Sequence, residues 1–214
     1  MRGRLITLEG VEGVGKSTVL PVITDFLVDR GVEVLQTREP GGTELGEQLR
    51  DVLLNTDQEI VPSAELLLMF AARAQHVEKV IVPALETGTW VVCDRFTDSS
   101  FAYQGGGRQL GSERVASLEK WVLGSLQADL TLLLDASRET SLERTKRRRE
   151  FDRIETEEDE FFARAKQAFL ERAKASPERI KVIDANPDFE TVSASICSEL
   201  NTSCSAWLQT AVAG

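Results

Sequence analysis

The sequence has 214 residues, of which 42% are hydrophobic and 28% charged, and its formal net charge is −10 at pH 7. A chain of this length and composition can bury the core of one compact domain, which excludes a disordered or fibrous protein. The negative charge argues against a general binder of nucleic acids or membrane surfaces.

The cysteines and apolar segments indicate the compartment. The three cysteines (Cys93, Cys197 and Cys204) are too few and odd in number for a disulfide framework, and with one histidine they fit no structural zinc site. A strand-like run begins within five residues of the start and leaves no room for a signal peptide. No stretch is long enough to span a bilayer. We therefore expect a cytoplasmic protein with reduced thiols.

Strand-like and helix-like segments alternate along the chain. Short apolar runs predict strands over residues 5–8, 32–35, 90–94, 130–135 and 180–184. Helical spacing of apolar residues predicts helices over 19–30, 45–54, 64–85 and 112–126, with Ser112 as N-cap, and a last helix from beyond Pro187 toward Trp207. The alternation predicts a single α/β domain over residues 1–214 with a buried parallel sheet.

A complete G-x-x-x-x-G-K-[ST] phosphate-binding loop joins the first predicted strand to the first predicted helix, which is the context that the motif requires. Its glycines let backbone N–H groups curve around phosphate oxygens, and the helix start adds the positive end of a dipole. Lys16 is expected to reach the β- and γ-phosphates, and the Ser17 hydroxyl to bind Mg²⁺. The alternative is a glycine turn without a ligand. The expected nucleotide-binding residues are Gly10, Val11, Glu12, Gly13, Val14, Gly15, Lys16, Ser17 and Thr18.

Charged residues follow three of the predicted strands: Arg38-Glu39, which opens a rigid polar turn, Asp94-Arg95, and Asp135. Ligands of open α/β sheets bind beyond the carboxyl ends of the strands. Asp94 is therefore a candidate for organising Mg²⁺ or its waters, and Arg95 for holding a second phosphate. The alternative for this pair is a surface ion pair that closes a strand.

Residues 144–153 form the strongly basic segment of this acidic chain, and acidic residues follow it over 155–160. Three interpretations are open: a nucleic-acid-binding patch, a solvated helix end, or a mobile lid. The neighbouring acidic residues argue against the first. We favour a lid over about residues 144–155, because arginines that close over a moving phosphoryl group stabilise its developing charge.

Phe70 and Arg73 lie three residues apart and share a face of the predicted 64–85 helix. Phe70 is either a core residue or a stacking platform for a base, with Arg73 as a hydrogen-bonding partner at the base edge. His76, one turn further on, is expected to be structural. The polar stretch over 99–104 is either a plain loop or a reader of base and sugar.

Five segments carry a family likeness: Glu9-Gly10-Val11-Glu12-Gly13-Val14-Gly15-Lys16-Ser17-Thr18, Arg38-Glu39-Pro40-Gly41-Gly42-Thr43, Asp94-Arg95-Phe96, Ser99-Ser100-Phe101-Ala102-Tyr103-Gln104-Gly105, and Asp152-Arg153-Ile154-Glu155. Together and in this order, over nearly the whole chain, they resemble the thymidylate kinases, which phosphorylate dTMP with ATP. The phosphate-binding loop holds no arginine, whereas the candidate lid does. The chain therefore looks like the bacterial subtype, in which the lid supplies that arginine.

The resemblance implies a P-loop NTPase-type α/β fold of three layers, with a five-stranded parallel sheet flanked by helices, and a homodimer. It implies that Lys16 and the loop backbone hold the ATP phosphates, with Ser17 on Mg²⁺, and that Glu12 and Asp94 organise the sugar or metal side. Arg38 and Arg95 would grip the 5′-phosphate of dTMP, with Glu39 in the same substrate site. The residues that it implicates in catalysis are Glu12, Lys16, Asp94, Arg95, Arg148 and Arg153.

The resemblance also assigns the base and sugar. Phe70 would stack on thymine, Arg73 would bond the base edge, and Ser100 and Gln104 would complete base recognition. Tyr103 would pack against the deoxyribose, where a 2′-hydroxyl would crowd it. Further arginines at 147 and 149 leave open which lid arginine is catalytic.

The sequence thus predicts direct in-line transfer of the γ-phosphoryl of MgATP to dTMP, giving dTDP and ADP for dTTP synthesis, with neither nucleic acid nor a membrane as partner. A kinase for another nucleoside or nucleotide is the nearer alternative, and dUMP, which lacks only a methyl group, is a candidate weak substrate. A GTPase-type switch or a regulatory nucleotide binder is the farther one. A switch would carry an N-K-x-D motif after a late strand, which this sequence lacks, and a regulatory binder would bind ATP without turning over a monophosphate.

Overall fold

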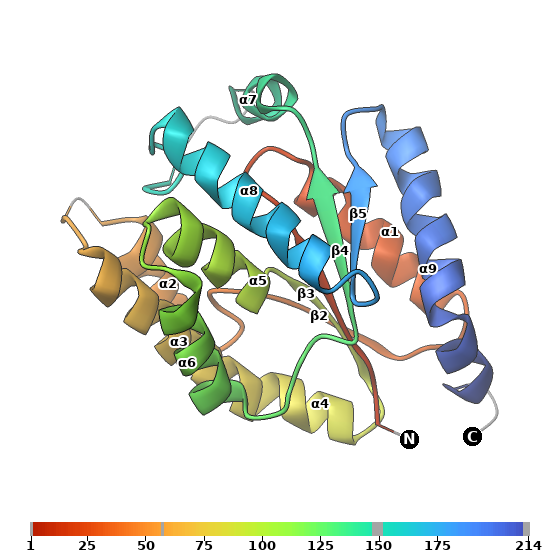
Figure 1. Ribbon diagram of the computed structural model, residues 1–214. Coiled ribbons are helices and arrows are strands. Elements are labelled where there is room, and N and C mark those ends of the chain that lie inside the picture. Colours follow the sequence, from red (N-terminus) through yellow and green to blue (C-terminus); the bar gives the residue numbers. More distant parts are fainter. Residues whose placement is uncertain (1, 57, 147–151, 212–214) are drawn as a thin grey trace.

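The computed structural model describes residues 2–56, 58–146 and 152–211 (Figure 1). Its sheet has five strands in the order β2-β3-β1-β4-β5, and every neighbouring pair is parallel. The strands are β1 (Leu5–Glu9), β2 (Val34–Arg38), β3 (Trp90–Asp94), β4 (Leu130–Asp135) and β5 (Ile180–Asp184). The predicted α/β fold with a five-stranded parallel sheet is confirmed.

Helices fill the connections between the strands, and a last helix follows β5. They are α1 (Lys16–Val28), α2 (Glu44–Leu54), α3 (Pro62–His76), the π-helical turn η1 (Val77–Ile81), α4 (Val82–Glu86), α5 (Thr97–Ser100), the π-helical segment η2 (Phe101–Gly107), α6 (Ser112–Leu123), α7 (Arg138–Lys146), α8 (Asp159–Ala175) and α9 (Phe189–Ala211). In the part of the chain that the structure describes, no helix is both long and apolar enough to cross a membrane.

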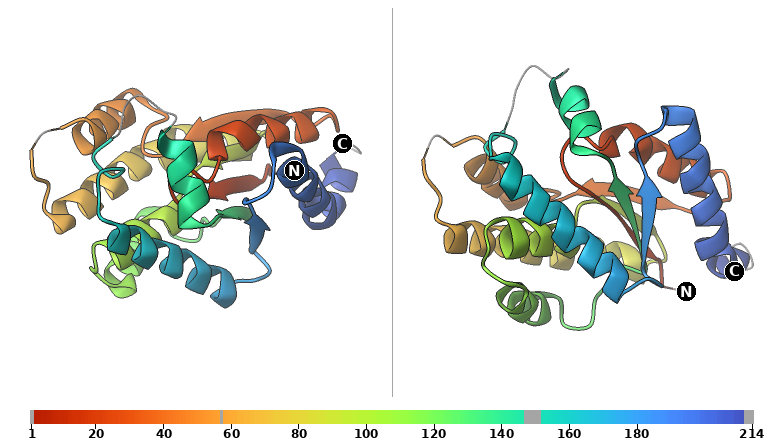
Figure 2. Two further views of the ribbon diagram at one scale, coloured as in Figure 1. Left: turned by 90° about the horizontal axis from the view of Figure 1, so that it is seen from above. Right: turned by 45° about the horizontal axis from the view of Figure 1, so that its top comes forward.

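The helices form two layers around the sheet. α1 and α9 cover one face, whereas α8 and the α5–η2 segment cover the other, with α3 and α6 further out (Figures 1 and 2). The central strands are buried on both faces, as Leu5, Ile6 and Val92, each 0% exposed, illustrate. Buried parallel strands read as continuous apolar runs, which is why the sequence located them well.

The edge strand β2 differs from its prediction. It covers Val34–Arg38 instead of residues 32–35, so Thr37 and Arg38 belong to the strand and not to the turn. The Glu39 N–H continues the ladder by donating to the Asp94 carbonyl over 2.9 Å. Backbone pairing with β3 thus extends the strand through polar residues that an apolar pattern does not include.

The long predicted helix over 64–85 is present but not uniform. It consists of α3, the wider turn η1 and α4 in direct succession. The wide turn ends at Ile81, two residues before Pro83, which has no N–H to donate to the helical ladder.

The polar stretch after β3 is helical rather than a loop. The α5–η2 segment continues through Gly107. α8 packs so closely against it that a Cβ on Gly107 would lie 2.5 Å from the Phe161 ring. Ser112 is the first residue of α6 and not its N-cap, a position that Gly111 occupies at φ 84° without a side-chain cap.

Candidate active site

The phosphate-binding loop, residues 10–17, connects β1 to α1 at the carboxyl edge of the sheet. Gly10 adopts a φ of 135°, and a Cβ at this position would lie 2.4 Å from the Leu134 carbonyl oxygen. Only glycine fits there. Val11 and Val14 are buried in the main core, which fixes the loop to the domain.

The start of α1 offers free N–H groups to an anion. Gly15 precedes the helix at φ 101° and provides no side-chain cap, and no acidic residue stands in the first turn. Ser17 and Thr18 are exposed there. This arrangement is a ready-made site for phosphate oxygens.

Lys16 reaches back over the loop. Its ammonium group donates to the Gly10 and Val11 carbonyl oxygens over 2.8 and 3.0 Å, and the side chain is only 8% exposed. Burial lowers the pKa of Lys16 from 10.5 to about 8. A bound polyphosphate would supply the negative charge that this buried cation lacks.

Asp94 and Arg95 lie at the end of β3, as predicted. Asp94 pairs with Arg38 in the parallel register of β2 and β3, so charged residues meet at one edge of the sheet. The Asp94 Oδ1 atom is buried without a hydrogen-bond partner among the described residues. Asp135, at the end of β4, instead pairs with Lys166 over 2.6 Å.

Arg95 is the centre of the site. Its backbone has a φ of 71°, which is rare for a residue other than glycine and typical of functional sites. The guanidinium donates to the Gly10 carbonyl over 3.0 Å and to the Glu12 carboxylate over 2.9 Å. The Tyr103 hydroxyl donates to the other Glu12 oxygen over 2.7 Å, and burial raises the pKa of Tyr103 well above its usual value, so that this proton stays in place.

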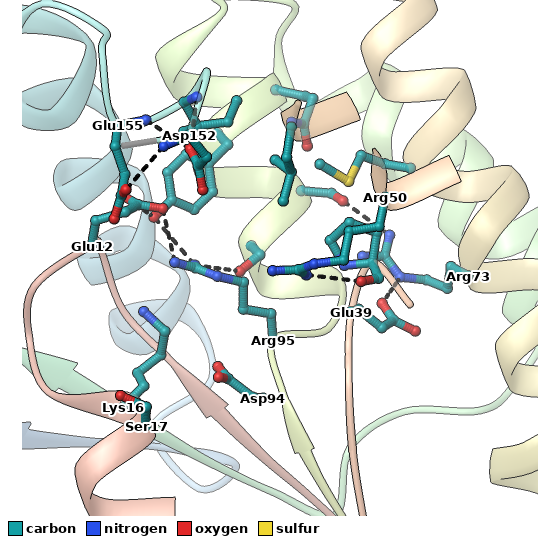
Figure 3. A pocket seen from close by; sticks show the side chains of 18 of the residues that line it. Glu12, Lys16, Ser17, Glu39, Arg50, Arg73, Asp94, Arg95, Asp152 and Glu155 are labelled. Carbon is teal, nitrogen blue, oxygen red and sulfur yellow. Dashed lines mark hydrogen bonds and ion pairs between the residues drawn. The ribbon is translucent and has the colours of Figure 1, made fainter. Parts of the chain in front are cut away.

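A cavity of about 310 Å³ opens between these residues and α3. Figure 3 shows Lys16, Ser17 and Asp94 at one end and Glu39, Arg50 and Arg73 at the other, with Arg95 between them. The residues that line it are Glu12, Gly13, Gly15, Lys16, Ser17, Glu39, Pro40, Arg50, Leu54, Met69, Arg73, Asp94, Arg95, Ser99, Ser100, Tyr103, Gln104, Asp152, Ile154 and Glu155. Segments far apart in the sequence thus meet in one place.

The α3 end of the cavity is held by buried polar groups. Arg73, 3% exposed, donates to the Glu39 carboxylate over 2.6 Å and to the Ser100 hydroxyl over 2.9 Å. Gln104, 2% exposed, donates to Glu65 over 2.9 Å. The structure therefore brings these predicted substrate residues together.

Phe70 lies in the core, which is one of the two roles predicted for it, and its stacking on thymine stays a prediction. Its ring is 2% exposed and packs in a core cluster with Leu66, Phe101 and Val115. Among the described residues, the apolar side chain that α3 contributes to the cavity is Met69. Successive helical residues point about 100° apart, so the cavity wall and the core receive neighbouring side chains.

The predicted role of Arg38 on the dTMP phosphate also stays a prediction. The Arg38 side chain is 54% exposed and pairs with Glu47 over 2.9 Å, and it is not among the described residues that line the cavity. Arg50 of α2 lines the cavity instead and donates to the Pro40 carbonyl over 2.9 Å. Sequence reasoning missed Arg50 because its position depends on how α2 packs against the turn after β2, and nothing local distinguishes it from a surface arginine.

The structure describes one of the two predicted lid arginines, Arg153, and not the other. Arg153 does not line the cavity of the described structure: it donates to the Leu53 carbonyl over 2.9 Å and to the buried Glu65 carboxylate over 2.5 Å. Burial alone would raise the pKa of Glu65, but hydrogen bonds from Arg108, Gln104 and Arg153 hold it below its usual value. Arg148 lies outside the described residues.

These features define a class of protein. A phosphate-binding loop faces a cavity in which arginines from other elements can hold a second phosphate, and buried polar groups line the far end. This is the arrangement of a P-loop kinase that acts on a small phosphorylated substrate.

The comparisons with known proteins identify the family. The family model for thymidylate kinase matches residues 8–196. The chain is 54% identical to a thymidylate kinase of Nitrosospira multiformis, over 94% of this chain and 98% of that one. It is also 54% identical to one of Bordetella pertussis, over 93% and 95% of the two chains. A crystal structure of thymidylate kinase from Ehrlichia chaffeensis matches with a TM-score of 0.77 and 32% identity, over 94% of this chain and 99% of that one.

The chain belongs to the thymidylate kinase family, and its activity is that of a dTMP kinase.

Proposed function

We propose that the cavity holds dTMP with its phosphate toward Lys16 and Arg95, so that it meets the γ-phosphoryl group of an ATP bound on the phosphate-binding loop. The observation that carries this proposal is the position of Arg95, between the loop and the α3 end of one cavity. Transfer is direct and in-line, and gives dTDP and ADP. The residues contribute by positioning two anionic groups and neutralising their repulsion.

The phosphate of dTMP would take the place of Glu12 as the partner of Arg95. Arg50 supplies a second cation at the same cavity. Arg50 and Arg95 both lie on elements other than the phosphate-binding loop. The dTMP phosphate would therefore be held by these two arginines, and the ATP phosphates by Lys16 and the loop. Arg148 is proposed to stabilise the transferring group, as the resemblance to the bacterial subtype implies.

The residues present fit a Mg²⁺ ion beside the loop. Ser17 and Asp94 line the end of the cavity that Lys16 occupies, and the buried Asp94 Oδ1 has no hydrogen-bond partner among the described residues. In the described residues no group of three or more His, Cys, Asp or Glu side chains forms a metal site. Ser17 and Asp94 would therefore hold Mg²⁺ together with phosphate oxygens and water, and the ion would screen the phosphate charges.

The far end of the cavity is proposed to read thymine and deoxyribose. Met69 lines this end as an apolar contact for the base, and its thioether suits an aromatic partner. The stacking of Phe70 on thymine, which the resemblance implies, stays a second candidate for this contact. Arg73, Ser100 and Gln104 present polar groups to the base edge. Tyr103, fixed by Glu12, would pack against the sugar.

The experiment is to measure ADP release from MgATP with dTMP, dUMP, dCMP, dGMP or AMP offered separately. Strong turnover on dTMP, weak turnover on dUMP and none on the others is expected. Activity on another monophosphate would retain the phosphate chemistry but contradict the base site. Activity on none would favour a nucleoside kinase or a nucleotide-binding regulator.

We also propose a homodimer. Exposed apolar side chains lie on three neighbouring helices: Leu45 and Val52 on α2, Leu67 on α3 and Trp121 on α6, which are 45–81% exposed. Such side chains favour association. Light scattering of the purified protein is expected to give a dimer, and Leu67→Asp is expected to give more monomer. We further propose a cytoplasmic location, which three cysteines without a disulfide support.

A further inference from the structure

A continuous hydrogen-bonded series leads from His76 to the cavity. His76 is the only histidine of the sequence and ends α3 with 0% exposure. Its Nδ1 lies 3.0 Å from the Glu39 carboxylate, whose other oxygen accepts from Arg73 Nε over 2.6 Å. Arg73 lines the cavity, whereas His76 does not touch it in the described structure.

The bonding partners determine the orientation of the imidazole. An ionised carboxylate only accepts hydrogen bonds, so His76 donates from Nδ1 to Glu39. The Thr37 hydroxyl lies 2.8 Å from Nε2 and can donate to it, which satisfies both ring nitrogens of a neutral imidazole. The ring also packs directly on the turn after β2. The approach is so close that a Cβ on Gly42 would lie 2.4 Å from His76 Nε2.

Glu39 is 3% exposed and depends on these two partners, Arg73 and His76. Each nitrogen of the Arg73 guanidinium donates one hydrogen bond, to Glu39, to the Ser100 hydroxyl or to the Phe96 carbonyl, and these bonds use three of its five N–H groups. If His76 no longer donated, one Glu39 oxygen would be buried without a partner. The carboxylate would then rotate or admit water, and Arg73 would lose its fixed position.

We propose that His76 is a positioning residue for the substrate monophosphate: its imidazole orients Glu39, which holds the Arg73 guanidinium edge against the base. This rests on the proposed function, in which Arg73 contacts the base edge. Since the series ends at the far side of the cavity from Lys16, it acts on dTMP binding and not on ATP.

The test compares His76→Leu, which removes the donor, with His76→Asn, whose amide N–H can replace Nδ1–H. His76→Leu is expected to raise the KM for dTMP about tenfold, with kcat and the KM for ATP within about twofold of wild type. His76→Asn is expected to recover most of that loss. Val77→Ala is the matched control: this neighbouring side chain, 6% exposed, packs in an apolar cluster, so the change lowers stability but not dTMP binding.

A second measurement uses the wild-type protein. Because the chain has one histidine, ¹⁵N labelling of histidine gives a single pair of ring signals. We expect the Nδ1 signal to shift on addition of dTMP and not on addition of a non-hydrolysable ATP analogue.

Equal KM values for dTMP in wild type and His76→Leu would overturn the proposal. It would also be overturned if the ¹⁵N signals of the His76 ring did not shift on addition of dTMP to an enzyme that phosphorylates dTMP. If His76→Leu does not fold, the ring signals alone decide. Wild-type enzyme without activity on dTMP would overturn the proposed function, and this inference with it.

Discussion

Arg95 donates a hydrogen bond to the Glu12 carboxylate over 2.9 Å, although the two residues are separated by 83 positions in the sequence. This contact joins the phosphate-binding loop to the end of β3. Tyr103 fixes the other Glu12 oxygen, so the Arg95 guanidinium is held in one orientation before any phosphate arrives. Preorganised charge of this kind is the main means by which a protein accelerates phosphoryl transfer.

Replacing Arg95 by Lys is expected to lower kcat/KM for dTMP by about 10²-fold, because an ammonium group keeps the charge but cannot hold two oxygens at once. Steady-state kinetics with dTMP varied would measure this loss. Arg114→Lys, on an exposed helix position, serves as the control. A small effect of Arg95→Lys would indicate that only charge matters at this position.

Replacing Lys16 by Ala is expected to reduce turnover by about 10³-fold. Near-normal ADP release by the variant would reject the assignment of the phosphate-binding loop.

Lys16 also predicts a pH effect. Burial lowers its pKa in the free protein to about 8, and the negative charge of bound phosphates raises that pKa again. Lys16 should therefore take up a proton when ATP binds above about pH 8, but not well below pH 8, where it is already protonated. Calorimetry in two buffers of different ionisation enthalpy measures this uptake. Lys16→Arg, which stays charged, should abolish it, and uptake that persists would come from another group.

Met69 and Phe70 provide a matched pair on α3. Met69→Ala is expected to raise the KM for dTMP about tenfold with little loss of stability, because its side chain lines the cavity. Phe70→Ala is expected to lower the free energy of unfolding by about 3–5 kcal/mol, because its ring is buried in the core. Urea unfolding and dTMP kinetics distinguish them. The reverse pattern would favour Phe70 over Met69 as the contact for the base.

Arg153 and Arg148 form a second pair. Arg153→Ala should lower the free energy of unfolding by about 2 kcal/mol, since it removes a partner of the buried Glu65. Arg148→Ala should lower kcat about 10²-fold and leave stability unchanged. Arg153 would count as the catalytic arginine only if its loss reduced kcat as strongly as that of Arg148.

Glu9 predicts how stability depends on pH. Burial, and then the charge of Asp98, raise its pKa from 4.5 to about 7. The folded state therefore holds this proton more tightly than the unfolded state, and the contribution of Glu9 to stability is lost as pH rises from 4.5 to about 7. Glu9→Gln does not titrate. The unfolding free energy of wild type relative to Glu9→Gln should therefore decrease with pH across this window, and an increase would mean that Glu9 is ionised in the folded state.

The sequence located most elements and one half of the site. β1, β3, β4 and β5 follow from apolar runs, and the phosphate-binding loop follows from fixed spacing between a strand and a helix. Asp94 and Arg95 were predictable because the carboxyl ends of parallel strands meet at one edge. These signals are local or follow from topology, so no packing detail is needed to read them.

The other half of the site depended on packing. Met69 and Phe70 are neighbours with similar apolar character, and only the way α3 packs against α6 and η2 determines which of them faces the cavity. Arg50 reaches the site through the packing of α2, and Arg153 is held away from the cavity by Glu65, 88 positions earlier. Periodicity tells which side of a helix is buried, but whether a side chain meets the core, a cavity or a distant carboxylate is decided by elements that are far away in the sequence.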